Sequence, residues 1–132
     1  VDNEPWKVYI QNAYYPSSSI EDAIYYSEKV LHIASSGTIV RRSKIAEKTY
    51  HHIIDPKTYK PAETDVLLAT VSAKSTLLAD VLASCAVILG SDKVIKKLRS
   101  MGADGLIMQL DDGNAVGFGE IFNTFKAREV VK

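Results

Sequence analysis

The segment between residues 66 and 90 constrains the fold more than any other part of the sequence. It begins with an eight-residue apolar run, VLLATVSA, whose composition predicts a strand buried on both faces. A nearly all-apolar helix is predicted next, from Leu77 to Leu89, with Ser75 or Thr76 as its cap and Gly90 at its end. The sequence therefore predicts one compact α+β unit that is built around this strand and helix.

The other elements are predicted from local patterns. Residues 23–35 fit a helix or two strands joined by a turn at 27–29, and the β-branched and aromatic residues favour two strands. A second helix is expected to start with Ser91 as its cap and to end at Gly102. The remaining expectations are strands at 6–11, 50–54, 106–110 and 115–118, a small-residue loop at 35–37, a solvated turn at 41–48, a stiff loop at 55–61, a tight turn at 111–114 and a charged tail at 126–132.

Composition excludes several classes of protein. The 132 residues are 46% hydrophobic and 24% charged, which is typical of a single globular domain. Sixteen Lys and Arg balance sixteen Asp and Glu, so there is no basic field to attract nucleic acid or an anionic membrane. The single Cys85 cannot form an internal disulfide and reads as a small core residue, and three histidines are too few for a histidine–cysteine metal cage. No apolar run reaches the roughly 18 residues that span a bilayer.

A histidine-rich strand end is the first candidate for chemistry. In HHIIDP (residues 51–56), neighbouring side chains alternate between the two faces of a strand, so only one histidine can face a given site. His52 would share a face with Ile54 and Pro56, and Asp55 could turn inward at the loop. The pattern alone favours a histidine that bonds to nearby backbone.

The second candidate is a carboxylate on the apolar helix. Asp80 is expected to be buried and therefore to need a cation, a proton or hydrogen bonds, because an unpaired buried charge costs several kcal/mol. Ser84 lies one turn further on the same helical face. Two hard oxygens suit Mg²⁺, but Ser84 could equally bond back to the carbonyl of residue 80.

A small-residue turn is the third and weakest candidate. In SSGT (residues 35–38), hydroxyls and backbone N–H groups in a tight glycine turn could hold phosphate oxygens. Such turns are also common as ordinary loops.

These candidates occur in a recognisable order. The runs SSG, YHHIIDPKTYKPA, VSA and LLADVLASCAVILG resemble the C-terminal half of the ApbE-type flavin transferases, the FAD:protein FMN transferases. The strand at Trp6 and the turn at 111–113 also fall where that family has a strand and a late hairpin. The resemblance spans residues 5–118. It implies an α+β fold in which a mixed or antiparallel sheet packs with helices, as in the C-terminal half of that T-fold-like family.

The resemblance implies an Mg²⁺-dependent enzyme that splits FAD, transfers FMN to a Thr or Ser hydroxyl of a target flavoprotein and releases AMP. Asp80 then matches a carboxylate ligand of Mg²⁺, and Ser84 matches a threonine ligand. His52 matches a histidine at the FAD pyrophosphate, in catalysis or in binding. The matches to FAD-contacting and pocket-shaping positions are Ser36, Gly37, Asp55, Pro56 and Thr58.

The sequence also departs from the family pattern. Tyr59 replaces a glycine, which is strained if that position has positive φ, and Thr38 stands where Asp is common. About half of the family's chain has no counterpart here, including a Gly-rich turn, a lysine and a backbone carbonyl ligand. We therefore expect residues 1–132 to be a single C-terminal domain or subunit that works with an N-terminal partner chain or with the other half of the same enzyme. Any export signal would lie upstream of Val1.

Two other functions remain open at this point. The same residues would serve an FAD-binding or FAD pyrophosphatase module in which water replaces the protein acceptor. A non-catalytic subunit that completes the fold of a partner is the third possibility, and its expected mark is an unpaired apolar sheet edge near Trp6.

Overall fold

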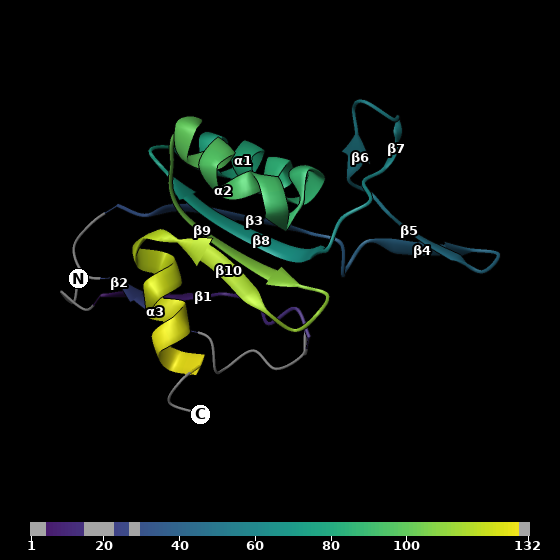
Figure 1. Ribbon diagram of the computed structural model, residues 1–132. Helices are drawn as coiled ribbons and strands as arrows, with labels where there is room; N and C mark the ends of the chain where they lie inside the picture. The colour runs from purple at the N-terminus through teal and green to yellow at the C-terminus, as the bar shows by residue number, and fades with distance from the viewer. Residues whose placement is uncertain (1–4, 15–22, 27–29, 130–132) are drawn as a thin grey trace.

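The computed structural model describes residues 5–14, 23–26 and 30–129 (Figure 1). Its centre is an antiparallel four-stranded sheet in the order β10-β9-β8-β3. The strands are β3 (His32–Gly37), β8 (Val66–Ala73), β9 (Ala103–Leu110) and β10 (Ala115–Phe118). The predicted α+β class is confirmed. In the part of the chain that the structure describes, no helix is both long and apolar enough to cross a membrane.

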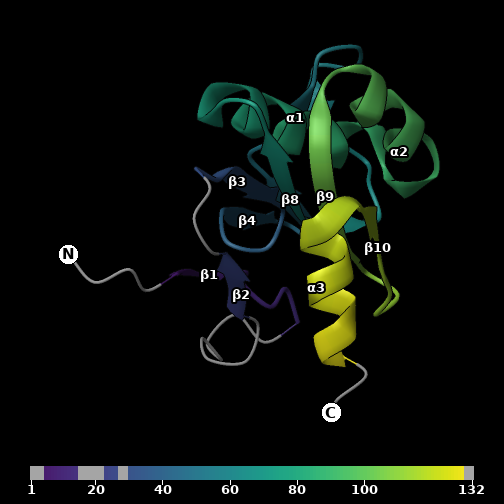
Figure 2. The ribbon, with the colours of Figure 1, turned by 90° about the vertical axis from the view of Figure 1, so that its left-hand side faces the viewer.

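Helices and a second small sheet cover the two faces of this central sheet. Helices α1 (Thr76–Leu89) and α2 (Ser91–Ser100) lie on one face, as Figures 1 and 2 show. Helix α3 (Gly119–Glu129) and the pair β1 (Trp6–Tyr9) and β2 (Ala23–Tyr26) lie on the other side. The sheet is thus the middle layer of three.

The buried residues form one cluster on each face. Along β9, Leu106 and Met108 belong to the cluster under α1 and α2, whereas Ile107 between them packs with Ile121 and Phe125 of α3. This alternation is the period of two that a strand imposes on its side chains. The prediction that β8 is buried on both faces is confirmed, since seven of its eight residues are buried.

A buried amide, that of Gln109, helps to fix the N-terminal segment to the sheet. Gln109 accepts a hydrogen bond from the backbone N–H of Ala13 and donates one to the carbonyl of Gln11, each at 2.8 Å. Both partners lie about a hundred residues away in sequence, so this contact is purely tertiary. The N-terminal strand is shorter than expected, and Trp6 is exposed.

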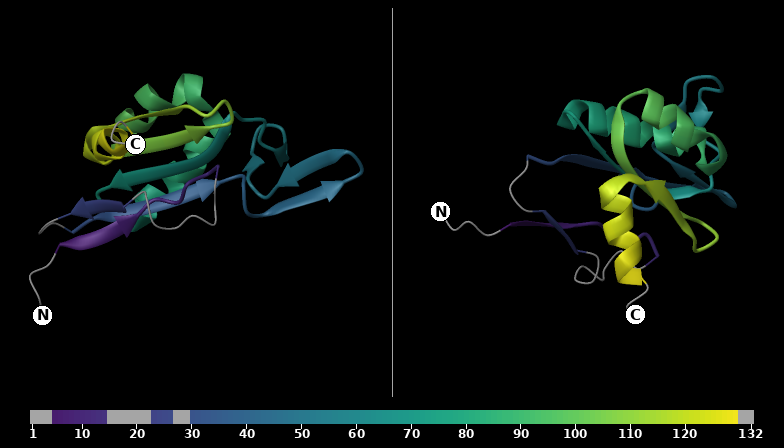
Figure 3. Two further views of the ribbon diagram at one scale, coloured as in Figure 1. Left: turned by 90° about the horizontal axis from the view of Figure 1, so that it is seen from below. Right: turned by 60° about the vertical axis from the view of Figure 1, so that its left-hand side comes forward.

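Residues 40–64 form an arm that projects beyond the end of the sheet (Figures 1 and 3). The arm contains two small hairpins, β4 (Arg42–Ile45) with β5 (Lys48–His51) and β6 (Ile54–Asp55) with β7 (Lys60–Pro61). Residues 41–48 are exposed, as predicted, but they form most of a paired hairpin and not a simple turn. The polar residues predicted the exposure and carried no signal for the strand pairing. The predicted strand at 50–54 is divided between β5 and β6.

Other local predictions have mixed outcomes. Two strands at 23–35 are confirmed as β2 and β3, and the turn expected at 27–29 lies outside the described residues. The loop expected at 35–37 is wrong, since these residues end β3 and pair with β8. Helix α3 replaces much of the expected C-terminal tail, because Ile121 and Phe125 bury one side of it against the sheet.

The corner between α1 and α2 depends on a carboxylate from outside both helices. The predicted Ser75 cap of α1 is confirmed, since its hydroxyl accepts from Leu78 N. The predicted Ser91 cap of α2 is wrong, because Ser91 is the first helical residue and Gly90 precedes it. Instead, Asp65 accepts hydrogen bonds from the Ser91 backbone N–H, at 3.0 Å, and from the Ser91 hydroxyl. A carboxylate at this position also complements the positive end of the helix.

We expect Asp65→Ala to lower the free energy of unfolding of the purified chain by about 1–2 kcal/mol, because α2 loses its only side-chain cap among the described residues. Urea denaturation followed by circular dichroism measures this. Glu63→Ala, an exposed carboxylate in the same segment, is the matched control and should change stability by no more than about 0.5 kcal/mol. Equal effects of the two substitutions would contradict the capping role.

The same contact predicts a pH dependence. Burial alone would raise the pKa of Asp65, but hydrogen bonds from the Ser91 hydroxyl and backbone N–H outweigh it and lower the pKa below 3.8. The stabilisation is therefore present above the unfolded-state value of about 4 and is lost as the pH falls through the lower folded-state pKa. Asp65→Asn should reduce the acid sensitivity of unfolding below about pH 4.

Candidate functional site

Two serine hydroxyls meet where α1 crosses β3. Ser36 Oγ lies 2.9 Å from Ser84 Oγ, and both side chains are half-buried. The preceding Ser35 points to the opposite face and bonds to Thr70 at 2.8 Å, as strand alternation requires. The structure thus joins two residues that the sequence analysis had placed in separate motifs. The alternative bond from Ser84 back to its own helix is replaced by this contact with Ser36.

Gly37 permits the close packing at this point. It is the last residue of β3, and a Cβ atom there would lie 2.7 Å from the Leu67 carbonyl oxygen and 2.9 Å from a Leu68 methyl group. No side chain fits in that space without a shift of backbone. The tight turn predicted at Ser36 and Gly37 is wrong, because the backbone of both residues pairs with β8. Their contact with a phosphate-containing ligand stays a prediction.

Asp80 lies one turn before Ser84 on α1 and is exposed, so its predicted burial is wrong. The physical reason is that α1 presents only one side to the sheet, through Ala79, Leu82, Ala83, Ala86 and Val87. The open side carries Leu77 and Val81 as well as Asp80, with Leu77 76% exposed. The apolar composition that suggested burial therefore includes apolar residues that this chain leaves uncovered.

The oxygens in this region have the chemistry of a partial magnesium site. The Asp80 carboxylate and the Ser84 hydroxyl are hard oxygen donors, and Mg²⁺ commonly takes one or two protein ligands plus water and phosphate oxygens. Among the described residues, no group of three or more His, Cys, Asp or Glu side chains converges on one point. These donors thus fit part of a magnesium site and do not make a complete cage.

The two adjacent histidines have different environments. His51 Nε2 lies 2.9 Å from the Ala62 carbonyl oxygen, and its Nδ1 accepts from the Ile53 backbone N–H at 3.3 Å. The sequence interpretation of a histidine bonded to nearby backbone thus describes His51. His52 is exposed and makes no hydrogen bond to any of the described residues, so its imidazole is accessible to a ligand.

The proline-containing loop is shaped by Asp55. Its carboxylate accepts from Lys57 N at 2.8 Å, and its carbonyl accepts from Thr58 N and from Tyr59 N. Pro56 lies within this turn. The strain predicted for Tyr59 is confirmed, because Tyr59 has φ 57° and is 85% exposed. Its side chain projects away from the protein.

Thr38, at the position where the family commonly has Asp, faces the protein interior. Its backbone N–H donates to the Leu67 carbonyl at 2.9 Å, and its hydroxyl donates to the Val66 carbonyl at 3.4 Å. Arg42 donates to the Thr38 carbonyl and hydroxyl oxygens. Thr38 therefore fixes the start of the arm to β8.

The predicted residues fall into two groups. Ser36, Gly37, Asp80 and Ser84 lie on the body, between β3 and α1, and the second group is on the arm, comprising His52, Asp55, Pro56 and Thr58. No hydrogen bond between described residues connects the groups. The arm also has a hollow of about 320 Å³ at the base of its first hairpin, lined in part by Arg41 and His52.

Comparison with known proteins, by sequence and by fold, matches this chain to one family. The model of the ApbE family matches residues 1–107. The FAD:protein FMN transferase of Treponema pallidum is 33% identical over 104 residues, and that of Salmonella typhimurium is 28% identical over 123 residues. The crystal structure of the ApbE protein from Thermotoga maritima superimposes with a TM-score of 0.74 at 30% identity over 92% of this chain.

The match covers most of this chain but a minor part of each relative. Residues 1–132 span 28% of the Treponema protein, 35% of the Salmonella protein and 38% of the Thermotoga structure. The fold is the α+β fold of the solved ApbE protein. The chain belongs to the ApbE family, as the resemblance predicted.

We expect the two histidines to differ in their effect on stability. His51→Ala should lower the free energy of unfolding by about 1–3 kcal/mol, because it leaves the Ala62 carbonyl and the Ile53 N–H without partners. His52→Ala should stay within about 0.5 kcal/mol, since His52 is exposed and unbonded. Urea denaturation of the two variants measures the difference. A greater loss of unfolding free energy in His52→Ala than in His51→Ala would contradict the assignment of the stabilising backbone hydrogen bonds to His51.

Tyr59→Gly should stabilise the loop by up to about 1 kcal/mol, because glycine adopts positive φ without steric cost. Slower hydrogen exchange at the residue 59 amide, which donates to Asp55, is the expected signal. The control is Lys57→Gly, at an exposed loop position without positive φ, which should accelerate exchange. Faster exchange in both variants would refute strain at Tyr59.

Proposed function

We propose that this chain is the C-terminal part of a magnesium-dependent FAD:protein FMN transferase. The observation that carries the proposal is the meeting of Ser36 and Ser84 beside the exposed Asp80 on α1, in a chain of the ApbE family. The relatives named above bear the name of this activity. In our proposal, Asp80 and Ser84 bind Mg²⁺, Ser36 and Gly37 lie against FAD, and the loop with Asp55, Pro56 and Thr58 shapes the pocket.

The reaction breaks one phosphoanhydride bond and forms one phosphoester bond. A Thr or Ser hydroxyl oxygen of the target flavoprotein attacks the phosphorus of the FMN part of FAD, and the bond to AMP breaks. A bound Mg²⁺ supplies charge stabilisation for the phosphate oxygens and the leaving AMP. The hydroxyl proton must be accepted by a base, and the exposed imidazole of His52 is available for it. In its charged form, the same imidazole would instead steady a phosphate.

The proposed FAD and Mg²⁺ site needs metal ligands and FAD-contacting residues in addition to those of residues 1–132. Asp80 and Ser84 provide only two metal ligands, and the arm group and the body group are not joined by hydrogen bonds among the described residues. Exposed apolar side chains, Leu77 and Val81, flank Asp80. We propose that an N-terminal half, in the same protein or as a partner chain, covers this side of α1 and completes the FAD site.

The test uses the chain assembled with an N-terminal ApbE-family half, together with FAD, Mg²⁺ and a flavoprotein acceptor. We expect covalent FMN on the acceptor, seen as in-gel fluorescence, and an equal amount of AMP. Release of free FMN and AMP without acceptor labelling would instead indicate an FAD pyrophosphatase. Assembly without either reaction, at any Mg²⁺ concentration, would indicate a non-catalytic subunit and would overturn the proposal.

Asp80→Asn should weaken Mg²⁺ binding by at least roughly tenfold, because it removes the charged ligand. The dependence of FMN transfer on Mg²⁺ concentration measures this shift. Asp104→Asn removes an exposed carboxylate from β9 and is the matched control, for which the Mg²⁺ curve should not change. Identical curves for wild type and Asp80→Asn would eliminate Asp80 as a ligand.

A further inference from the structure

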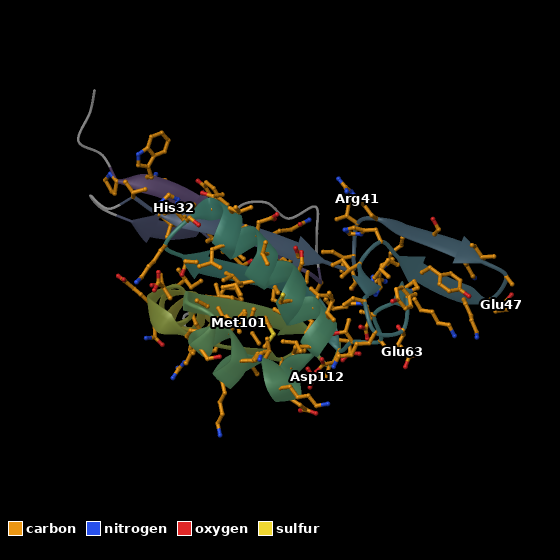
Figure 4. The ribbon with its side chains drawn as sticks, turned by 90° about the horizontal axis from the view of Figure 1, so that it is seen from above. His32, Arg41, Glu47, Glu63, Met101 and Asp112 are labelled. Atoms are coloured by element: carbon orange, nitrogen blue, oxygen red, sulfur yellow. The ribbon has the colours of Figure 1, made fainter. Side chains whose placement is uncertain are left out.

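Strand β3 and helix α1 are joined by hydrogen bonds between side chains at two points. At the first, His32 Nδ1 lies 3.0 Å from Thr76 Oγ1, in the first residue of the helix. At the second, Ser36 Oγ lies 2.9 Å from Ser84 Oγ. Figure 4 shows His32 beside the start of α1, on the side of the body away from the arm, so the Ser36–Ser84 contact lies further along both elements.

The spacing of the two contacts shows that the strand and the helix run side by side between them. A strand rises about 13 Å from residue 32 to residue 36. A helix rises about 12 Å from residue 76 to residue 84. Because these lengths agree, both contacts form together, and the pairing of Ser36 with Ala69 of β8 keeps the strand in place. The Ser36 hydroxyl is thus held at a fixed position beside Ser84.

A metal ion at Ser84 would decide the direction of this hydrogen bond. A hydroxyl group has one proton and two lone pairs, so Ser84 Oγ can bind Mg²⁺ with a lone pair only while its proton points to another acceptor. Ser36 Oγ lies within hydrogen-bond distance to accept that proton. The proton of Ser36 itself then remains for a further acceptor, such as a phosphate oxygen of FAD.

Ser84 needs such a partner more than a threonine would. By the resemblance described above, the ApbE family has a threonine at this position, and a β-branched side chain is restricted at χ1 in a helix. Serine lacks that methyl group, and its hydroxyl can turn back to the helix carbonyl of residue 80. In this structure, the contact with Ser36 replaces that bond.

We propose that Ser36 is a positioning residue for the metal site, because its Oγ accepts the Ser84 proton and so directs a lone pair of Ser84 Oγ to Mg²⁺. The inference rests on the proposed function, which assigns Mg²⁺ to Asp80 and Ser84. It gives Ser36 a role in addition to its proposed place against FAD. It also explains how a serine can serve where the family has a threonine.

The test is a calorimetric titration of Mg²⁺ alone, without nucleotide, into the chain assembled with an N-terminal ApbE-family half. We expect Ser36→Ala to raise the Kd for Mg²⁺ by roughly tenfold or more, which is the usual effect of removing a group that orients a metal ligand. An unchanged Kd would overturn the positioning role, and so would a failure of the unsubstituted assembly to bind Mg²⁺.

Ser35→Ala is the matched control. Ser35 is the neighbouring residue of β3, and its hydroxyl lies 2.8 Å from the Thr70 hydroxyl on the opposite face of the sheet. The substitution therefore removes a hydrogen bond of the same kind from the same strand, and it should leave the Kd for Mg²⁺ unchanged. Equal losses of Mg²⁺ affinity in Ser35→Ala and Ser36→Ala would show a general loosening of β3 and would contradict the proposal.

A second variant separates positioning from a loss of folding. In the Ser36→Ala background, Ser84→Thr should recover part of the Mg²⁺ affinity, because the added methyl group restricts χ1 without help from Ser36. A strand that no longer folds in Ser36→Ala would not be repaired by a change on the helix. If the double variant binds Mg²⁺ no more tightly than Ser36→Ala, the positioning role is refuted.

The outcomes separate this inference from the proposed function. Mg²⁺ binding that weakens in Ser36→Ala, in an assembly without FMN transfer, would support the positioning role and refute the transferase. FMN transfer with a raised KM for FAD but an unchanged Kd for Mg²⁺ in Ser36→Ala would support the transferase. That result would assign Ser36 to FAD alone and overturn its role at the metal.

Discussion

Strand β8 is buried on both faces, and the other layers of the fold are arranged to cover it. This strand has almost no solvent contact, so it requires cover from both sides. Helices α1 and α2 provide it on one face, while α3 and the N-terminal segment contribute to the other. Because α1 must pack across β8 and β3 together, it brings Ser84 to Ser36 and leaves Asp80 on its outer side. The position of the candidate metal ligands is thus a consequence of how the core is covered.

The arm is stabilised differently from the body. Its side chains are mostly exposed, so little apolar burial holds it, and polar contacts to backbone fix its base instead. Arg42 and His51 anchor the two strands of the first hairpin, and Asp55 shapes the loop that follows. Arg41 and His52 line the hollow, are exposed, and form no hydrogen bond with a described residue. Their side chains are therefore accessible to a partner on the surface of the arm.

Much of the fold could be predicted because its signals are local and periodic. The β8 strand, the Ser75 cap, the ends of α1 and the β9–β10 hairpin all follow from patterns within a few residues. Two of the failures share one cause, which is dependence on distant partners. The Ser36–Gly37 segment has the composition of a loop but is a strand because β8 lies beside it. Similarly, α2 is capped by Asp65, 26 residues away from Ser91.

The family, the central strand and helix, and the residue types available for chemistry could all be predicted from the sequence, because motif order and hydrophobic period are properties of the chain. Which of these residues meet, and which remain unpaired among the described residues, follows from the packing of the folded chain. In the structure, His51 bonds to a backbone carbonyl, whereas His52 is exposed. Thr38 is buried and bonds to the Val66 carbonyl, and Asp80 lies at the surface. Exposure and hydrogen-bond partners depend on what packs against a residue, and a local pattern does not show it: Thr38, for example, bonds to the Val66 carbonyl 28 residues away.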